Sequence, residues 1–492
     1  YSLGGRLSGE HGIGYKRRGL MERFTDPVEL SMMKAIKKNR GLTTEYIREL
    51  SARKKEPKWM LDLRLLGLSY WEKLKMPAWA PDITELKLDG ILMYVEPKKE
   101  MVGSWDEVPA EIRETFEQLG IPEAEREHLA GVGAQYDSEV IYHNLKEQIA
   151  KKGVVYLPME EAVATTQKPR EEVIRQYGVD VAEILKKHFM KLISESDHKF
   201  AALHAAVWSG GSFIYVPKNV SVEIPIQSYY RLNAPGAGQF EHTLIIVDEG
   251  SDLHFIEGCS APKYTVSNLH AGSVELYVKK NSRLKFSTVE SWSKNVFNLN
   301  TKRAYVEEDG AIEWVTGSFG SRISMLYPMG ILAGARAKME YTGVTFAGAE
   351  QNLDTGAKVV HIGPNTYSMM MAKSLSKDGG ISTTRTLAKI CKTAVGAKSY
   401  TDCKSLILDD KSISNAIPEV KVECDDAEVS HEASVGKISD EAIYYLKTRG
   451  ISEDEARAMI VRGFTGDISK ELPIEYAMEM NNLIKMEMEG TA

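Results

Sequence analysis

The sequence predicts a mainly β protein with helical ends, built around a β-helix (β-solenoid) core. Three observations support this prediction. Residues 209–437 alternate between apolar and polar side chains, which is typical of strands. A short turn-and-strand motif recurs within the same region. The flanking regions 39–208 and 438–492 instead repeat their apolar residues with the period of a helix.

The recurring motif consists of a turn residue, a small residue, and then two apolar residues that flank a polar one. Its four copies lie roughly 25 to 31 residues apart, within the range of repeat proteins, and begin at Gly250, Asn281, Asp309 and Gly334. Each unit can bury its apolar face only against the next, which favours a β-helix. A sandwich with irregular hairpins is the alternative, but it is not expected to keep one motif in register four times.

Composition excludes several classes of protein. The 492 residues are 43% hydrophobic and 27% charged, as in an ordinary soluble protein. The net charge of −7 gives no reason to expect nucleic acid or an anionic membrane as a partner. Four scattered cysteines are too few for a disulfide framework, so we expect a reducing, cytoplasmic setting. Neither a signal peptide nor an apolar run of membrane-spanning length is present.

The first part of the chain, 1–38, differs from the rest. A glycine-rich loop, Gly4–Gly14, leads into a helical run whose start is marked by Asp26 and Pro27. This stretch resembles the C-terminal end of FAD-linked oxidases of the glycolate oxidase and D-lactate dehydrogenase kind. No flavin-binding domain precedes it, so we interpret it as a fused remnant or a sequence-assembly artefact and do not expect oxidase activity. The absence of an initiator Met is consistent with a fragment or a fusion.

The N-terminal part, 39–208, is expected to be a helical and mixed α/β domain. A helix is predicted from Gly41, capped by Thr43 or Thr44, until Pro77 breaks the pattern. Further along the chain we expect helices near 109–119 and 122–129, and a strand at Val154–Leu157.

A long helix is predicted near Val181–Ala206. It carries His188, His198 and His204, which have no cysteine or carboxylate at a ligand spacing. We therefore expect these histidines to be partly exposed helix residues.

Potential metal ligands lie close together in the sequence between Tyr400 and Glu432. They are Cys403, Cys424, His431 and Glu432, in a chain that has only two other cysteines. A thiolate with an imidazole or a carboxylate suits zinc, ferrous iron or an iron–sulfur cluster. The spacing lacks a CxxC or HxxxH pattern, so a buried structural cysteine beside an exposed His-Glu pair is the alternative. Adjacent strand residues face opposite ways, so His431 and Glu432 can serve one site only at a strand end or bend.

The C-terminal part, 438–492, is predicted to be helical. Asp440 and Glu441 begin a helix that ends before Gly450, and Ser452–Glu455 forms a capping box for the next. A last helix is predicted from Pro473. Because these helices cannot bury much surface alone, they must dock on the solenoid or on a partner. The alternative is that they cap one end of the solenoid.

Several blocks in order resemble the SufB scaffold family of the SUF iron–sulfur cluster assembly system. The resemblance extends over about 41–492, and the blocks that carry it are Glu56–Leu61, Met76–Trp79, Glu257–Pro262, Asn268–His270, Tyr400–Cys403, Ser430–Ala433, Tyr445–Ser452 and Met459–Phe464. It implies a scaffold, not an enzyme, on which a transient iron–sulfur cluster is assembled. Reduced FAD is a further expected cofactor of the complex, although no flavin pocket is evident in 41–492.

The resemblance also implies roles for single residues. Cys259 corresponds to the position that receives persulfide sulfur from a cysteine desulfurase or its sulfur carrier. The residues expected along the sulfur route are Arg231, Asn233 and Trp292, and the arginine is a candidate cation for the Cys259 thiolate. The expected cluster ligands are Cys403 with His431 or Glu432, at an interface with a SufD-like paralogue or a second copy of the chain. Two departures from the family pattern, Lys404 and Ser430, alter local charge without removing a ligand. Cys391 and Cys424 are expected to be structural.

The same resemblance places a SufC-like ABC ATPase on the C-terminal helices. The docking region is expected at about Ile443–Phe464, with contacts from Tyr445, Arg449, Met459, Ile460 and Phe464. ATP hydrolysis must come from that partner, because the chain has no Walker A motif.

Two other functional classes stay open. The first is a structural solenoid adaptor without cluster chemistry. The second is a polysaccharide lyase or hydrolase that uses acid pairs such as Asp248-Glu249 or Asp409-Asp410. Those pairs fall mostly at turns, where solvated acids are common.

Overall fold

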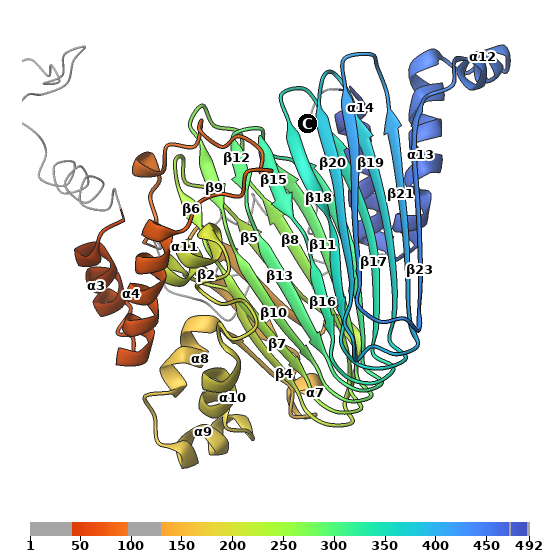
Figure 1. Cartoon of the computed structure of the whole chain (residues 1–492). Helices are drawn as coiled ribbons and strands as arrows, with labels where there is room; N and C mark the ends of the chain where they lie inside the picture. The colour runs from red at the N-terminus through yellow and green to blue at the C-terminus, as the bar shows by residue number, and fades with distance from the viewer. Residues whose placement is uncertain (1–41, 97–128, 472–473, 490–492) are drawn as a thin grey trace, which may run out of the picture.

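The computed structural model describes residues 42–96, 129–471 and 474–489. The predictions for 1–38 and for helices near 109–119 and 122–129 lie outside these residues, except for Leu129. Within them, two large sheets wind together into a β-solenoid, with helices against its N-terminal coils and along one face near its C-terminal coils (Figure 1). The predicted fold class is confirmed.

One sheet contains a long parallel ladder that begins at an antiparallel hairpin, β1 (Gly131–Tyr136) and β2 (Glu139–Leu145). The parallel strands that follow are β5 (Ser221–Arg231), β8 (Asp252–Ser260), β11 (Arg283–Trp292), β14 (Ala311–Gly320), β17 (Lys338–Ala347), β19 (Tyr367–Ser376), β21 (Ala397–Ile407) and β23 (Ala427–Lys437).

The second sheet supplies the other wall. Its main ladder is β3 (Val155–Pro158), β4 (Ser212–Val216), β7 (His242–Val247), β10 (Ser273–Val278), β13 (Thr301–Val306), β16 (Met329–Leu332), β18 (Asn352–His361), β20 (Ile381–Ile390) and β22 (Ile413–Val422). A row of shorter strands also leads to β18, namely β6 (Gly238–Gln239), β9 (Asn268–His270), β12 (Val296–Asn298) and β15 (Ile323–Leu326).

The repeated motif marks one turn of each coil. Its first residue takes the left-handed backbone conformation, with φ of 70° at Gly250, 56° at Asn281 and 54° at Asp309. Glycine, Asn and Asp adopt this conformation more readily than other residues, which explains the pattern. The same conformation recurs at Asn219, Arg336, Asn365 and Gly396, so the repeat extends beyond the four predicted copies.

The predicted register of the fourth copy was wrong by two residues. Met339 pairs with Ile312, in the row that contains Leu284 and Leu253. The turn position therefore belongs to Arg336 and not to Gly334. Arg336 takes a φ of 59°, which is uncommon for arginine. A search for glycine, Asn or Asp at the turn therefore does not find it.

Inside the solenoid, like side chains stack from coil to coil. The rings of Phe255 and Phe286 lie 5.2 Å apart, and those of Phe286 and Trp314 lie 5.4 Å apart. Further along the same strands the interior becomes polar, with buried Glu257 and Glu290. The core therefore has an apolar half near the motif turns and a polar half beyond it.

The N-terminal helices are α3 (Thr44–Arg53), α4 (Lys58–Lys73), α7 (Glu147–Ala150), α8 (Met159–Thr165), α9 (Arg170–Tyr177), α10 (Val181–His188) and α11 (Lys199–Val207), with a 3₁₀ turn at Leu88–Gly90. The Thr43 hydroxyl accepts a hydrogen bond from the Tyr46 N–H, which confirms Thr43 as a cap. The strand predicted at Val154–Leu157 forms as β3.

The long helix predicted over Val181–Ala206 is in fact two helices. Its break is held by Glu275, whose carboxylate accepts hydrogen bonds from the backbone N–H groups of Met190, Leu192 and Ile193 at 2.6 to 2.8 Å. A carboxylate from a distant coil thus satisfies backbone donors that a continuous helix would have used. This contact cannot be read from local sequence.

The expected exposure of the histidines was wrong for His188 and His204, which are buried. His204 Nε2 lies 3.0 Å from His242 Nδ1, and His242 Nε2 lies 3.1 Å from Glu275 Oε2. This buried chain ties helix α11 to the second sheet. His198 is half-buried and caps α11, since its Nδ1 accepts from the Ala201 N–H at 3.2 Å.

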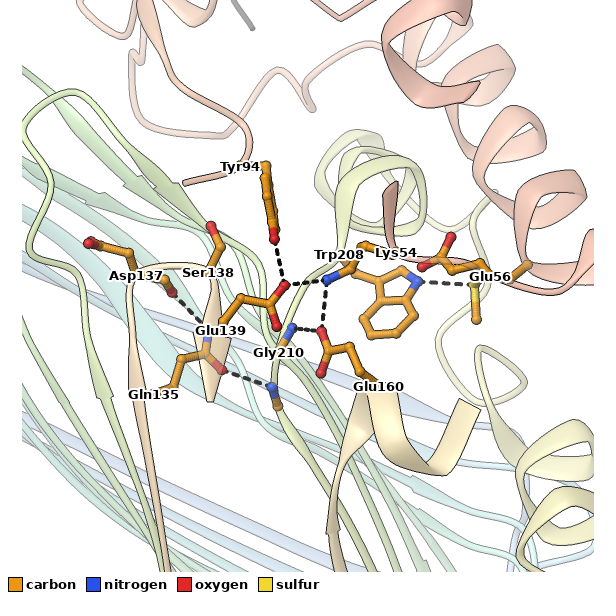
Figure 2. Close-up of polar contacts among 12 residues, drawn as sticks. Lys54, Glu56, Tyr94, Gln135, Asp137, Ser138, Glu139, Glu160, Trp208 and Gly210 are labelled. Atoms are coloured by element: carbon orange, nitrogen blue, oxygen red, sulfur yellow. Dashed lines mark hydrogen bonds and ion pairs between the residues drawn. The ribbon is translucent and has the colours of Figure 1, made fainter. Parts of the chain in front are cut away.

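A buried ion pair joins the N-terminal helices to the first coil (Figure 2). The Lys54 ammonium lies 2.8 Å from a Glu139 oxygen and 3.0 Å from a Glu160 oxygen, and its side chain is 4% exposed. Tyr94 also donates to Glu139, and the Gly210 N–H donates to Glu160. One cation thus connects elements that are far apart in sequence.

The C-terminal helices are α12 (Asp440–Thr448), α13 (Glu453–Glu471) and α14 (Ile474–Glu489). The predicted cap at Ser452 is confirmed, since the Glu455 N–H donates to the Ser452 hydroxyl at 3.3 Å. The helices pack on the outer face of the first sheet through a buried apolar cluster whose members include Ile256, Val315, Phe346, Ala456, Val461, Met480 and Ile484. They do not close the solenoid end, because side chains along β22 and β23 stay exposed. None of the described helices is long and apolar enough to span a membrane.

Candidate functional site

The solenoid buries two of the four cysteines. Cys259 and Cys403 are each 2% exposed, whereas Cys391 and Cys424 are half-buried. The two buried thiols lie on the same sheet, in β8 and β21. They are the two cysteines that the sequence singled out for sulfur and cluster chemistry.

Cys259 lies in the polar half of the interior. In register it stands between Tyr230 on β5 and Glu290 on β11, and it packs with Trp292 in a buried cluster. Burial raises the pKa of the Cys259 thiol well above its usual range, and the nearby carboxylates of Glu257 and Glu290 raise it further. In this conformation the thiol is protonated at neutral pH.

Lys302 is a cation that acts on Cys259 and favours its thiolate. The Lys302 ammonium pairs with Glu257 and donates to the Thr288 hydroxyl at 2.9 Å. Burial opposes its charge, but Glu257 and Glu290 outweigh burial and raise the pKa of Lys302. This ammonium is the group that can stabilise a thiolate or persulfide at Cys259.

Arg231, the predicted cation, faces elsewhere. It pairs in register with Ser260, and its Nη1 donates to the Ser260 hydroxyl at 2.8 Å. Because successive strand residues face opposite ways, Arg231 and Cys259 point to different sides of the sheet. The sequence signal for Lys302 was available: it is an inward-facing lysine in the alternating strand Thr301–Val306.

The other two residues predicted along the sulfur route, Trp292 and Asn233, lie in different places. Trp292 joins the Cys259 cluster, and its ring lies 4.5 Å from that of His270. Asn233 is on the loop after β5, where its backbone N–H donates to Asp137 Oδ1 at 2.6 Å. The structure therefore brings Cys259 and Trp292 together, while Arg231 faces the other side of the sheet and Asn233 lies on the loop after β5.

Cys403 occupies the last layer of the apolar core. Its register partners are Ala372 on β19 and Ala433 on the edge strand β23. Burial raises the pKa of the Cys403 thiol to about 11, although the Thr386 hydroxyl opposes the shift. Only one strand on this sheet separates Cys403 from the open end of the solenoid.

The two candidate co-ligands stand on different faces of β23. His431 pairs with Thr401, and Glu432 pairs with Asp402. On β21, Thr401 and Cys403 face inward, whereas Asp402 is more exposed. His431 therefore shares the inward face with Cys403, two residues before Ala433 on the neighbouring strand, and Glu432 lies on the outer face.

The departures from the family pattern are also visible. Lys404 Nζ lies 2.7 Å from Asp402 Oδ2, so the substituted lysine compensates an acid beside the candidate site. Ser430 pairs in register with Tyr400 and is exposed. Neither change removes a thiol or imidazole from the inward face.

The terminal coil presents an apolar surface. Its exposed large hydrophobic residues include Ile413 at 47%, Ile417 at 40%, Val420 at 46%, Val422 at 48% and Val435 at 51%. β22 and β23 each end their sheet with an unpaired edge. Such an edge together with an apolar patch is typical of an interface.

One chain does not complete a metal site by itself in the part that the structure describes. No group of three or more His, Cys, Asp or Glu side chains there is arranged to hold a metal ion. Cys403 and His431 lie next to the open end of the solenoid.

The predicted docking residues divide into two groups. Tyr445 is 57% exposed and Met459 is 41% exposed, and Arg449 is exposed beside Tyr445. Ile460 and Phe464 are partly buried against the cluster that holds the helices on the sheet. The first three can reach a partner, whereas the last two position the helix.

Comparison with known proteins identifies relatives for most of the chain. Residues 230–464 match the family model described as SUF system FeS cluster assembly, SufBD core domain. Residues 1–39 match a second family model, FAD linked oxidases, C-terminal domain.

Among the curated relatives, an iron–sulfur cluster assembly SufBD family protein of Staphylococcus aureus (strain MRSA252) is 48% identical over 452 residues, which is 92% of this chain and 94% of the relative. A protein of the same description from Staphylococcus haemolyticus (strain JCSC1435) is 47% identical over the same shares of both chains.

Proposed function

Because the chain belongs to the SufBD family of iron–sulfur cluster assembly proteins, we propose that it is the SufB-type scaffold of its system. In this proposal it receives sulfur at Cys259 and builds a labile cluster at Cys403. The single observation that carries the proposal is the position of Cys403, buried one strand from an open apolar edge. The cluster is the cargo of the scaffold and not a resident cofactor.

The chemistry of the sites supports these roles. A persulfide at Cys259 needs a cation, and Lys302 supplies one inside the solenoid. A cluster that must later leave needs few protein ligands, in contrast to a four-cysteine cage. Cys403 with His431 provides such a sparse set, and Glu432 joins it only if the edge strand β23 changes its orientation.

The remaining ligands are proposed to come from a second chain, either a SufD-like paralogue or another copy of this one. The exposed apolar residues of β22, including Ile417 and Val420, are the proposed contact. The Ile417→Asp, Val420→Asp double variant should lose the partner. A matched control is Ile224→Asp, which changes an exposed residue on β5, far from the terminal coil.

Anaerobic reconstitution with iron and sulfide tests the scaffold role. We expect a visible cluster chromophore that is lost in Cys403→Ala and kept in Cys391→Ala. Equal behaviour of the two variants would remove Cys403 from the proposal and favour a structural solenoid adaptor.

The C-terminal helices are proposed to dock a SufC-like ATPase, which would supply ATP hydrolysis. The Tyr445→Ala, Met459→Asp double variant should lose the ATPase in a co-purification assay. The Met478→Asp variant, at a residue of α14 that is 62% exposed, is the control. If the double variant keeps the ATPase, this docking surface is wrong.

The wider setting is proposed on the same family membership. We expect sulfur delivery by a cysteine desulfurase or its carrier and a cytoplasmic location. Reduced FAD stays a proposal for the assembled complex, and it rests on the family membership.

A further inference from the structure

A cavity of about 430 Å³ lies between N-terminal segments of the chain, 74–79 and 197–200, and the outer face of the second sheet. Its walls come from the segment 74–79, the start of α11, and strands β13, β16 and β18. The volume is in the range of small-molecule sites. None of the residues proposed above for cluster ligation or ATPase docking lines it, and Lys302 contributes to its wall although the Lys302 ammonium is paired with Glu257.

The charges around this cavity are not balanced within the described chain. Arg303 pairs with Asp197 at 2.6 Å, and Arg385 forms a two-point contact with Asp354 at 2.8 and 3.2 Å. Both nearby acids are therefore already engaged by arginines. The ammonium of Lys358 has no carboxylate partner among the described residues.

Lys358 lies in the floor of the cavity. In register it stands between Met329 and Leu387, and the next residue in that row is Glu419. Leu387 therefore separates the lysine from the nearest acid of its own row. Burial lowers the pKa of Lys358, and the cations of Arg303 and Arg385 lower it further. The carboxylates of Asp354 and Glu419 raise this pKa but do not outweigh burial and the two arginines, and no described ion pair holds the ammonium. A half-buried charge that is only partly compensated destabilises the fold, so its presence points to a ligand.

A second ammonium stands on the opposite wall. Lys199 donates to the carbonyl oxygens of Trp71 at 2.8 Å and Leu74 at 3.0 Å, and no described carboxylate neutralises it. Lys199 and Lys358 both line the cavity. Two cations without acids create a site for an anion.

A hydroxyl donor is also available. The Nδ1 atom of His198 accepts from a backbone N–H, so its Nε2 carries the proton and donates to Thr301 Oγ1 at 3.0 Å. Burial lowers the pKa of His198 to about 4, which keeps this tautomer neutral at pH 7. The proton of the Thr301 hydroxyl is then free to bond an anionic oxygen in the cavity.

The remaining walls are apolar and aromatic. Trp79 is 46% exposed, and its ring lies 6.0 Å from that of Tyr327 in an edge contact. The Arg385 guanidinium covers Trp79 at 4.3 Å, and the Lys358 ammonium lies 4.7 Å from the Tyr327 ring. The exposed Trp79 ring beside these cations suits a flat ring that carries a negative group.

From this arrangement we infer that the cavity binds an organic phosphate of mononucleotide size. The ring packs against Trp79 and Tyr327, and the phosphate is held by Lys358, Lys199 and the Thr301 hydroxyl. This site is separate from the proposed cluster chemistry and does not depend on it.

Isothermal titration of the full chain, without any ATPase partner, tests the inference with AMP, adenosine and inorganic phosphate as probes. We expect AMP to bind more tightly than either fragment, with an affinity that falls as salt is raised. Lys358→Met should weaken AMP binding about tenfold or more, since it removes a charge-assisted contact. Lys358→Arg should retain most of the affinity.

Matched controls separate binding from folding. Lys389→Met changes a partly exposed lysine on the same sheet outside the cavity and should bind AMP as the wild type does. The unfolding free energy of Lys358→Met should equal or exceed that of the wild type. Absence of AMP binding by the wild type at millimolar concentration would overturn the inference. Equal binding of AMP and adenosine, or unchanged binding by Lys358→Met, would also overturn it.

Discussion

Cys403 and Glu432 face opposite sides of one parallel ladder, although they lie on neighbouring strands. Asp402 pairs with Glu432, and Cys403 pairs with Ala433. His431, opposite Thr401, is the candidate on the same face as the thiol. A ligand set that joins Cys403 to a neighbour in this conformation therefore uses the imidazole.

The first prediction concerns the order of ligand effects. His431→Ala should lower the iron and sulfide retained after anaerobic reconstitution more than Glu432→Ala does, because only His431 shares the inward face with Cys403. Metal analysis with the visible spectrum measures both. A larger loss in Glu432→Ala would mean that the edge strand turns over when the cluster forms.

The second prediction concerns thiol reactivity. Cys259 and Cys403 should react slowly with iodoacetamide at pH 8, because both are buried and their pKa values are raised, to about 11 for Cys403. Cys391 and Cys424, which are half-buried, should react first. Peptide mass spectrometry after timed quenching gives the order, and denaturant should make all four react alike. Rapid native labelling of Cys259 would contradict the closed interior.

The third prediction concerns the buried ion pair of Lys54 with Glu139 and Glu160. Lys54→Met should lower the free energy of unfolding by about 3 kcal/mol, because it leaves Glu139 and Glu160 without their shared cation. Denaturant unfolding measures the change. Lys58→Met is the matched control, since the Lys58 side chain is 85% exposed and its pair with Asp62 lies in solvent. If the two variants have the same stability, the buried pair does not hold the helices.

The fourth prediction concerns acid. Burial lowers the pKa of His143, His198, His254 and His361 from 6.5 to about 4. Between these values the unfolded chain binds protons that the folded chain does not. Stability should therefore be fully present above pH 6.5 and fall as the pH drops toward 4.

A titration-free variant isolates one histidine. His254→Gln can keep a hydrogen bond to the Ser287 hydroxyl, which His254 makes at 2.9 Å, but it cannot titrate. The slope of unfolding free energy against pH should decrease by up to about one proton in this variant. Denaturation curves at several pH values give the slopes. An unchanged slope would show that His254 does not contribute.

The fold class could be predicted because a β-solenoid repeats its turn chemistry. The residue types at Gly250, Asn281 and Asp309 indicate a left-handed turn, whereas the arginine at position 336 does not. The repeat was therefore found, but its fourth copy was misplaced by two residues. The capping residues Thr43 and Ser452 were found for a similar reason, since capping acts within a few positions of the chain.

The parts that could not be predicted depend on contacts between distant coils. Glu275 breaks the expected long helix from a separate strand, and His242 buries His204. Strand alternation was known in principle, yet the face of Arg231 depends on the register with β8, which only the coordinates give. The alternation of the strand Thr301–Val306 indicates the inward face of Lys302, but its place near Cys259 depends on contacts between coils.

The terminal coil ends both ladders with a strand whose outer edge is unpaired in the described chain, β22 in one sheet and β23 in the other. The outer backbone donors and acceptors of these strands point away from the solenoid. The isolated chain therefore exposes strand edges that can pair with another chain, and its association state depends on which chains are present. Produced without a companion, it should aggregate or pair with itself as its concentration rises. Produced together with the correct companion, the same surface becomes interior, and solubility itself reports that the right assembly has formed.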